Sequence, residues 1–200
     1  MAVSDCSPLE AAGSFESTGS SSAPSSSISH RRGGEPSRYR PAVPEPQQLP
    51  DPRFELAFEV RFDVEPAVRV GGASEHEQLH FVPIVGGSVS GPSLSGTVLP
   101  GGGDWYVDRD GVAHLDARYV LRTDDGDLVD VRNRGFWRAS PEVTARLDDG
   151  VDVPENAYYY RTSPVFTTGA EGLRWLTETV FVGMARSENG AICIRFFALA

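Results

Sequence analysis

One acidic residue in the middle of the chain has the surroundings that acid/base chemistry requires. Asp104 follows three glycines, Gly101–Gly103, and precedes Trp105. Glycine lets the backbone approach a ligand closely or turn a sharp corner. An indole beside a carboxyl group excludes water, and burial raises the pKa of a carboxyl group toward the range useful for proton transfer. Asp104 is therefore the candidate acid or base, with Trp105 as an apolar wall. The alternative is that Asp104 caps the loop while Trp105 packs in the core.

Arg118 is the candidate electrostatic clamp, and its strand leaves two orientations open. In an extended strand Asp116 and Arg118 share one face, and Tyr119 lies on the other. If the charged face points inward, Arg118 binds an anion or a carbonyl, with Asp116 as its partner. If it points outward, the charges form a solvated ladder and Tyr119 lies inside, beside a ligand.

Tyr160 is the candidate proton donor or oxyanion partner. Tyr158 and Tyr160 share one face of a predicted strand, and Arg161 lies on the opposite face. A phenol in a pocket can donate to a substrate oxygen or pass a proton on. Aromatic residues are also common in strands and cores, so packing alone is the alternative for Tyr160. Arg161 either contacts substrate or forms a structural ion pair.

Four further residues are candidate substrate contacts. Asn133 shares a strand face with two valines, and a buried Asn needs hydrogen-bond partners. Its side chain therefore either contacts a ligand or forms hydrogen bonds at the end of the strand. His80 lies between Leu and Phe and is a candidate lone acid/base group. Phe166 and Trp175 are candidate apolar walls of a pocket.

The sequence carries no pattern that predicts a metal or a cofactor. His76 and His80 are four apart, but this spacing does not converge on a strand as it does on a helix. The acidic string from Asp124 to Asp130 lacks the register of a calcium loop. All 18 basic residues besides histidine are Arg, which excludes Schiff-base lysines and a lysine-containing phosphate loop. We therefore expect no metal and no cofactor.

The net charge of −10 excludes several kinds of partner. An acidic chain repels nucleic-acid phosphates and anionic lipid surfaces, so we expect a small-molecule ligand and neither a nucleic acid nor a membrane. No apolar run reaches the length of a membrane span, and no apolar signal segment follows the N-terminus, so we expect a cytoplasmic protein. A homo-oligomer stays open.

Strand signals dominate the rest of the chain. Residues 54–64 alternate apolar and charged side chains with a period of two. Asp110-Gly111, Asp125-Gly126 and Asn189-Gly190 supply the positive φ angles of tight hairpins. Residues 141–147 are the one helical segment, with Ser140 as N-cap and Pro141 at the first helical position. The predicted strands are 54–64, 79–85, 94–99, 105–108, 112–123, 128–134, 158–163, 179–184 and 191–199.

These elements predict an all-β protein, a single antiparallel β-barrel of about nine strands with one short helix. Barrel closure removes exposed sheet edges, and a sandwich is the alternative. Residues 1–50 contain 12 Ser, 7 Pro and 4 Gly and too few apolar side chains to build a core. We expect a disordered leader over residues 1–50 and the barrel domain over residues 51–200.

Several strings in the barrel region resemble a family when taken in order. They are Gly86-Gly87, Gly91-Pro92-Ser93-Leu94-Ser95-Gly96, Val98–Trp105, Asp116-Ala117-Arg118-Tyr119, Thr123–Gly126, Asn133-Arg134-Gly135, Tyr159–Phe166, Trp175-Leu176-Thr177 and Val180–Gly183. Over about residues 54–199 the chain resembles the bacterial and fungal domain of unknown function 3237 family, also called uncharacterised protein family UPF0311. The resemblance implies a compact, somewhat lipocalin-like β-barrel with an internal or mouth-side pocket, and it implies no particular reaction.

Three hypotheses for function remain open. The first is an enzyme that transfers protons on a small, largely apolar molecule, as in isomerisation, cyclisation, elimination or hydration, with Asp104, Tyr160 and Arg118 in the catalytic roles. The second is a carrier or sensor that binds a ligand in the same cavity without turnover. The third is a structural module with a filled barrel. Converging ionisable groups in a cavity would favour the enzyme.

Overall fold

The computed structural model describes residues 50–74, 76–188 and 190–200. The leader predicted over residues 1–50 lies, apart from Pro50, outside the described residues. The strands are β1 Phe54–Val64, β2 Val68–Ser74, β3 Glu77–Ser90, β4 Gly96–Val98, β5 Gly102–Arg109, β6 Val112–Thr123, β7 Leu128–Arg138, β8 Tyr159–Thr167, β9 Phe181–Glu188 and β10 Ala191–Leu199. The helices are α1 Pro141–Asp148, the 3₁₀ turn η1 Glu171–Leu173 and α2 Arg174–Glu178.

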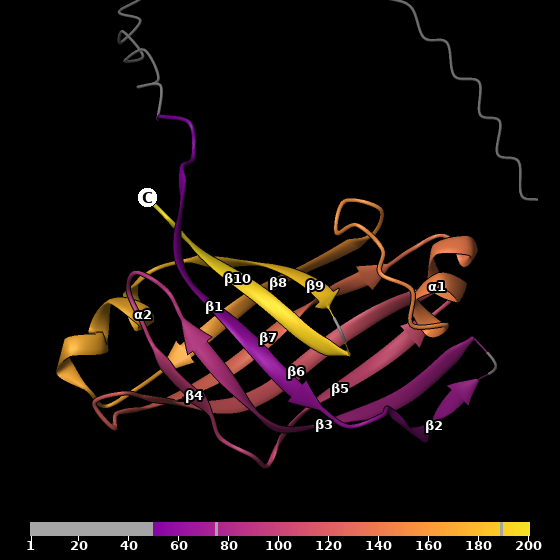
Figure 1. The fold of residues 1–200 in the computed structure, drawn as a ribbon, viewed down its shortest axis with the longest axis horizontal. Helices are drawn as coiled ribbons and strands as arrows, with labels where there is room; N and C mark the ends of the chain where they lie inside the picture. Colours follow the sequence, from indigo (N-terminus) through magenta and orange to yellow (C-terminus); the bar gives the residue numbers. More distant parts are fainter. Residues whose placement is uncertain (1–49, 75, 189) are drawn as a thin grey trace, which may run out of the picture. The chain divides into compact units, whose positions relative to one another are not determined.

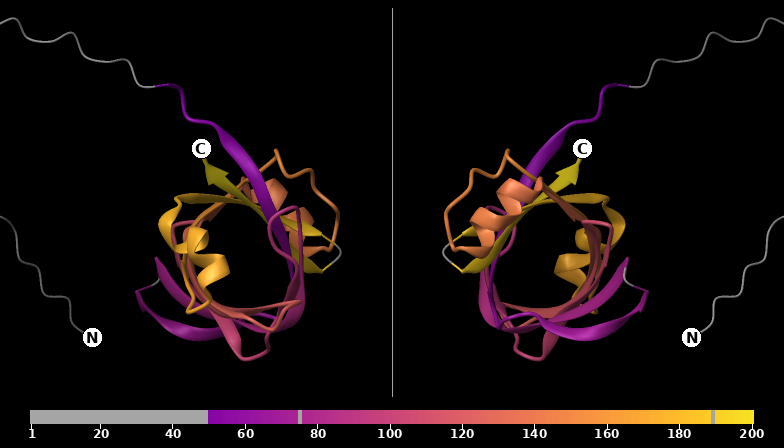
Figure 2. Two further views of the ribbon diagram at one scale, coloured as in Figure 1. Left: turned by 90° about the vertical axis from the view of Figure 1, so that its left-hand side faces the viewer. Right: turned by 90° about the vertical axis from the view of Figure 1, so that its right-hand side faces the viewer.

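The strands close into an antiparallel barrel (Figures 1 and 2). The chain of neighbours runs β1, β10, β9, β8, β7, β6, β5 and β3, and β3 pairs back onto β1. Strand β4 occupies the same position as β5, between β3 and β6, but nearer to one end of the barrel. Strand β2 extends the sheet on the outer side of β3. The closed antiparallel barrel that the sequence predicts is confirmed.

Strand β1 shows how the apolar alternation builds the wall and where it is interrupted. Phe58, Val60 and Phe62 point inward and are buried. The alternation alone places Leu56 on the same face, yet Leu56 is exposed. A β-bulge between Leu56 and Phe58 shifts the register against β10, so Ala57 takes the inward position instead. A bulge inserts one residue and reverses the face of those beyond it.

The predicted hairpin turns join the strands as their residue types require. Asp110 and Gly111 have φ angles of 52° and 82° between β5 and β6, which is the geometry of a type I′ turn. Gly126 has a φ of 91° between β6 and β7. Gly190, with a φ of 74°, follows Asn189, which lies outside the described residues.

The helices lie at opposite ends of the barrel (Figure 1). Helix α1 begins as predicted, because the Ser140 side chain accepts a hydrogen bond from the Val143 N–H and Pro141 occupies the first turn. The prediction of a single helix missed the five-residue α2, whose Leu176 is buried. It also missed β2, so the described residues form ten strands rather than nine.

Apolar side chains fill one part of the barrel interior tightly. Phe58, Phe166, Phe181 and Phe196 form a cluster with ring centroids 5.0–5.9 Å apart. Trp175 of α2 packs on Phe181, so this cluster lies toward the α2 end. The open space of the barrel therefore lies away from α2.

Candidate functional site

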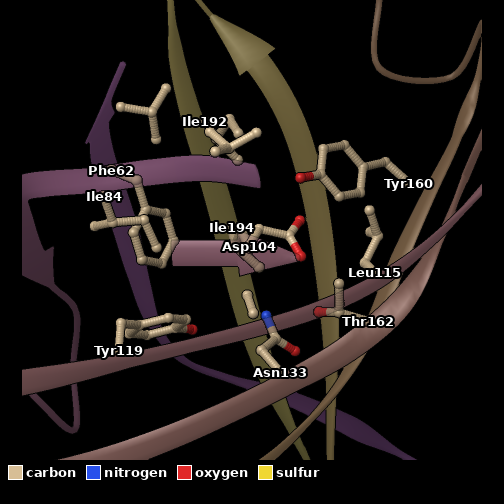
Figure 3. Close-up of a pocket in the computed structure, with 13 residues that line it drawn as sticks. Phe62, Ile84, Asp104, Leu115, Tyr119, Asn133, Tyr160, Thr162, Ile192 and Ile194 are labelled. Atoms are coloured by element: carbon tan, nitrogen blue, oxygen red, sulfur yellow. The ribbon is translucent and has the colours of Figure 1, made fainter. Parts of the chain in front are cut away.

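A small cavity lies inside the barrel. Its volume is about 30 Å³, enough for one or two water-sized groups. Most of its wall is apolar, and its polar side chains are those of Asp104, Tyr119, Asn133, Tyr160 and Thr162 (Figure 3). The lining residues are Phe62, Val64, Val82, Ile84, Asp104, Leu115, Ala117, Tyr119, Asn133, Tyr160, Thr162, Ile192 and Ile194.

A wider space of about 330 Å³ adjoins this cavity and forms its mouth. Thr144 and Asp148 of helix α1 line one side of the mouth. The mouth and the inner cavity share Asp104 and Tyr160 together with three apolar residues, Val82, Leu115 and Ile192. Asp104 and Tyr160 therefore lie at the neck, where a ligand in the mouth would reach the interior.

An interruption in the β5–β6 ladder positions Asp104. The register pairs Asp104 with Ala117 and Val107 with His114, and the residues between these pairs are not paired with each other. One backbone group freed there is the Asp116 N–H, which donates to Asp104 Oδ1 at 3.0 Å. The side chain of Asp104 thus replaces a missing ladder bond and is held toward the interior.

The surroundings of Asp104 favour its protonated form. Burial is the main cause that raises its pKa from 3.8 to about 6. The hydrogen bond from the Asp116 N–H opposes this rise, and the negative charge of Asp116 adds to it. At neutral pH most Asp104 side chains are ionised, with a basicity suited to accepting a proton.

Two buried tyrosines line the cavity with Asp104. In Figure 3 the Tyr160 hydroxyl faces the Asp104 carboxylate, and Tyr119 lies deeper, beside Asn133. Burial raises the pKa of both phenols well above the usual value of 10.0. Both hydroxyls therefore stay protonated at neutral pH and can donate hydrogen bonds.

Three buried polar atoms of the cavity wall have no partner at hydrogen-bonding distance and angle among the described residues, although the Asn133 side chain lies close enough to Tyr119 to oppose the rise in the Tyr119 pKa. They are the Tyr119 hydroxyl, Asn133 Oδ1 and Thr162 Oγ1. Buried polar atoms are nearly always paired, so an unpaired set around one cavity marks a place for a bound polar group. Their side chains point toward one another across the cavity floor (Figure 3).

The structure decides the orientation that the sequence left open for β6. Tyr119 and Leu121 point into the barrel and are buried. Arg118 points outward and forms a two-bond ion pair with Asp130, at 3.0 and 3.2 Å. Its side chain is 73% exposed and lines no part of the cavity or the mouth. The geometry thus does not bring the Arg118 side chain to Asp104. Of the two orientations predicted for this strand, the one with the charged side chains in solvent is found.

Of two other candidate contacts, Trp105 also lies on the outer surface and His80 does not. Trp105 is 50% exposed and packs on Phe81, with ring centroids 4.3 Å apart. Alternation along β5 places it on the face opposite to Asp104. His80 instead lies on the inward face of β3, two residues from Val82, and stacks on Tyr106 of the mouth at 4.7 Å. Its Nδ1 is buried without a hydrogen-bond partner among the described residues, and His80 itself lines neither the cavity nor the mouth.

Three more candidates are structural neighbours of the site rather than part of its wall. Phe166 belongs to the packed aromatic cluster, and Trp175 covers the end of that cluster. Arg161 donates to the Tyr160 carbonyl oxygen at 2.7 Å and lies over the Tyr159 ring on the outer face. Of the predicted site residues, Asp104, Tyr160, Tyr119 and Asn133 come together around the cavity.

Thr162 and the apolar wall were missed. Thr162 follows Tyr160 by two residues, so strand alternation would have placed both on one face. Leu115 and Ala117 follow in the same way from Tyr119. Nothing in the sequence around Ile192 and Ile194 distinguishes residues that line a cavity from residues packed in an ordinary core.

The described residues contain no group of three His, Cys, Asp or Glu side chains placed to hold a metal ion. Cys193 is a buried thiol next to Arg61, and burial raises its pKa. Among the same residues, no helix is long and apolar enough to cross a membrane.

Fold and cavity together define a closed antiparallel β-barrel with a carboxyl group and a phenol at the neck of an internal cavity. The chain belongs to the family described as protein of unknown function DUF3237, whose model matches residues 52–199. A UPF0311 protein of Clostridium acetobutylicum is 32% identical over 148 residues, which cover 74% of this chain and 94% of that relative.

Two solved structures share the fold. A β-barrel-like protein of Acinetobacter baumannii has a TM-score of 0.66 and 32% identity, over 77% of this chain and 99% of its own. An enzyme from Penicillium herquei has a TM-score of 0.58 and 20% identity, over 76% of this chain and 98% of its own. The similarities to the Clostridium acetobutylicum and Acinetobacter baumannii proteins agree with the family. The similarity to the Penicillium herquei enzyme is one of fold alone.

Proposed function

We propose that this protein is an enzyme that transfers protons on a small, largely apolar organic molecule without a cofactor. The observation that carries the proposal is Asp104, a carboxyl group at the neck of the cavity whose pKa is raised by burial to about 6. Perturbed carboxyl groups in clefts are frequent in active sites. The apolar body of the substrate would lie in the mouth, with its reacting group at the neck.

Asp104 would act as the base. The Asp116 N–H holds one carboxylate oxygen at 3.0 Å, which leaves the other free to accept a proton from a substrate O–H or C–H. The same group then returns that proton to another atom of the substrate or of its product. This cycle consumes no oxidant or reductant and fits isomerisation, cyclisation, elimination or hydration.

Tyr160 would stabilise the charge that develops on a substrate oxygen. Its hydroxyl faces Asp104 at the neck (Figure 3), and burial keeps it protonated. A positioned hydrogen-bond donor in a water-poor site typically contributes about 10²–10³ to the rate. Arg118 has no part in this mechanism, because it points away from the cavity.

The alternative is a carrier that binds the same ligand without turnover. A carrier pocket for an apolar ligand needs no ionisable group at its neck, whereas this neck holds both Asp104 and Tyr160. The Penicillium herquei protein that shares the fold is described as an enzyme, so this fold is compatible with catalysis. Both observations favour the enzyme.

The proposal is tested on the molecule that native mass spectrometry identifies in freshly purified protein. Turnover of that molecule would be measured for the parent and for Asp104→Asn, which keeps the shape of the side chain. We expect kcat/KM to fall at least hundredfold in the variant, while binding persists. An unchanged kcat/KM would contradict the role of Asp104, and binding without turnover in the parent would favour the carrier.

A further inference from the structure

The deep end of the cavity contains a compact set of unpaired oxygens. Tyr119 and Asn133 are 2% exposed and Thr162 is 6% exposed, and their polar atoms find no partner among the described residues. Burying such atoms without hydrogen bonds costs free energy. The fold therefore keeps three unpaired groups at one place, each of which a bound group could satisfy.

The chemistry of these atoms defines the group that would fit. Asn133 Oδ1 only accepts hydrogen bonds, whereas the hydroxyls of Tyr119 and Thr162 both donate and accept. A hydroxyl can donate to Asn133 and accept from Tyr119 or Thr162. A carbonyl or an ether can only accept, so it would leave Asn133 Oδ1 unpaired.

The charge around the cavity selects against an anion. The mouth contains three carboxyl groups, those of Asp104, Asp108 and Asp148. Among the described residues that line the cavity or the mouth, none is an Arg or a His. A carboxylate ligand would meet like charges in a site of low dielectric constant, and no cation there would offset the repulsion.

The cavity and the mouth together have room for one hydroxyl group on a larger apolar ligand. The inner cavity of about 30 Å³ accommodates an oxygen and its carbon, and the mouth of about 330 Å³ accommodates a ring system. Gly183 keeps the space beside Thr162 open, because a Cβ at residue 183 would lie 2.1 Å from Thr162 Oγ1.

From these observations we infer that Tyr119, Asn133 and Thr162 form a specificity subsite for an uncharged hydroxyl group on an apolar ligand. The inference rests on the proposed function in one respect, namely that the ligand enters through the neck beside Asp104. It assigns the substrate to the alcohols and phenols, and it separates recognition by these three residues from proton transfer by Asp104 and charge stabilisation by Tyr160.

Four probes with one carbon skeleton test the subsite by isothermal titration calorimetry. They are naphthalene-2-methanol, its methyl ether, naphthalene-2-methylamine and 2-naphthoate. We expect the alcohol to bind at least tenfold more tightly than the ether and the naphthoate, and more tightly than the amine. Equal binding of alcohol and ether, tighter binding of the amine or the naphthoate, or binding of none of the four would each overturn the inference.

Two near-isosteric variants then locate the preference. Thr162→Val and Asn133→Leu should bring the alcohol and the ether to within threefold of each other, with thermal melts showing that both variants are folded. Thr123→Val is the matched control, because the Thr123 hydroxyl accepts from the Asp127 N–H at the β6–β7 hairpin and lies outside the cavity. A preference that persists in both cavity variants, or that disappears in the control, would overturn the inference.

Asp104→Asn distinguishes the two proposals. We expect it to abolish turnover and to keep the preference for the alcohol over the ether. Loss of turnover without any alcohol preference in the parent would contradict the subsite alone. An intact preference with undiminished turnover would contradict the proposed function alone.

Discussion

The backbone N–H of Asp116 donates a hydrogen bond to the Asp104 carboxylate at 3.0 Å. The side chain of Asp116 points the other way, to the outer face, where it accepts from Arg132 and Arg134. One residue therefore fixes the candidate base with its backbone and anchors the surface charge ladder with its side chain. Hydrogen bonds from those arginines lower the pKa of Asp116 to about 2, which keeps it ionised while Asp104 titrates.

Asp104 is expected to lower the stability of the fold at neutral pH. Its pKa is about 6 in the folded protein against the ordinary value of 3.8, so the folded state binds more protons between these values. Stability contributed by this group is therefore lost as pH rises from about 4 to 6, by up to about 3 kcal/mol. Asp104→Asn should raise the free energy of unfolding at pH 8 and flatten this dependence, as measured by urea denaturation across the pH range. A less stable variant at pH 8 would contradict the expectation.

The same group predicts the pH dependence of catalysis. If Asp104 is the base, kcat/KM should rise with pH and level off above about pH 6, the pKa of the free enzyme. The profile would be measured on the identified substrate. A kcat/KM that falls through pH 6 would instead make Asp104 the acid. A kcat/KM that stays constant between pH 5 and 8 would show that the ionisation of Asp104 does not affect catalysis.

Tyr160→Phe should lower kcat by about 10²–10³ and change KM little, because the lost donor acts on charge that develops during the reaction. Tyr158→Phe is the matched control, because Tyr158 is buried like Tyr160 and immediately precedes β8. The Tyr158 hydroxyl accepts from the Ser187 N–H at 3.0 Å, so its loss should cost about 1 kcal/mol of stability and leave kcat unchanged. Equal effects of the two variants on kcat would show that Tyr160 is structural.

Arg118→Ala should leave both kcat/KM and the melting temperature nearly unchanged. Its ion pair with Asp130 is exposed to solvent, and such pairs contribute little to stability. Steady-state kinetics and a thermal melt at two salt concentrations would check this. A large loss of kcat/KM would restore Arg118 to the site and require a different orientation of β6.

The strands and turns of the barrel could be predicted wherever a local sequence pattern is compatible with only one type of structure. The period-two alternation of residues 54–64 and the Asp-Gly turns lead directly to β1 and the hairpins. Strand β2 was missed because Gly71 and Gly72 are typical of a loop, although β3 supplies the pairing that makes the segment extended. Such pairing depends on residues distant in sequence and leaves no local signal.

The candidate site was predictable only in part, for a similar reason. Asp104 and Tyr160 stood out by their neighbours, and the cavity brings them together. The orientation of β6 could not be predicted because both of its faces carry polar and apolar residues. Phe166 was an equally good wall or core residue by type, and only the packing of four phenylalanines decides between these roles.

The pairing of β1 with β10 has a consequence for the order of events during protein synthesis. Phe54 lies opposite Leu199, so the ring closes only after a ribosome has released nearly the whole domain. Ile192 and Ile194, two walls of the cavity, belong to that last strand. A nascent chain can form the central hairpins earlier, but it has neither a finished cavity nor a protected β1 edge. Ligand binding can therefore begin only once β10 has left the ribosome.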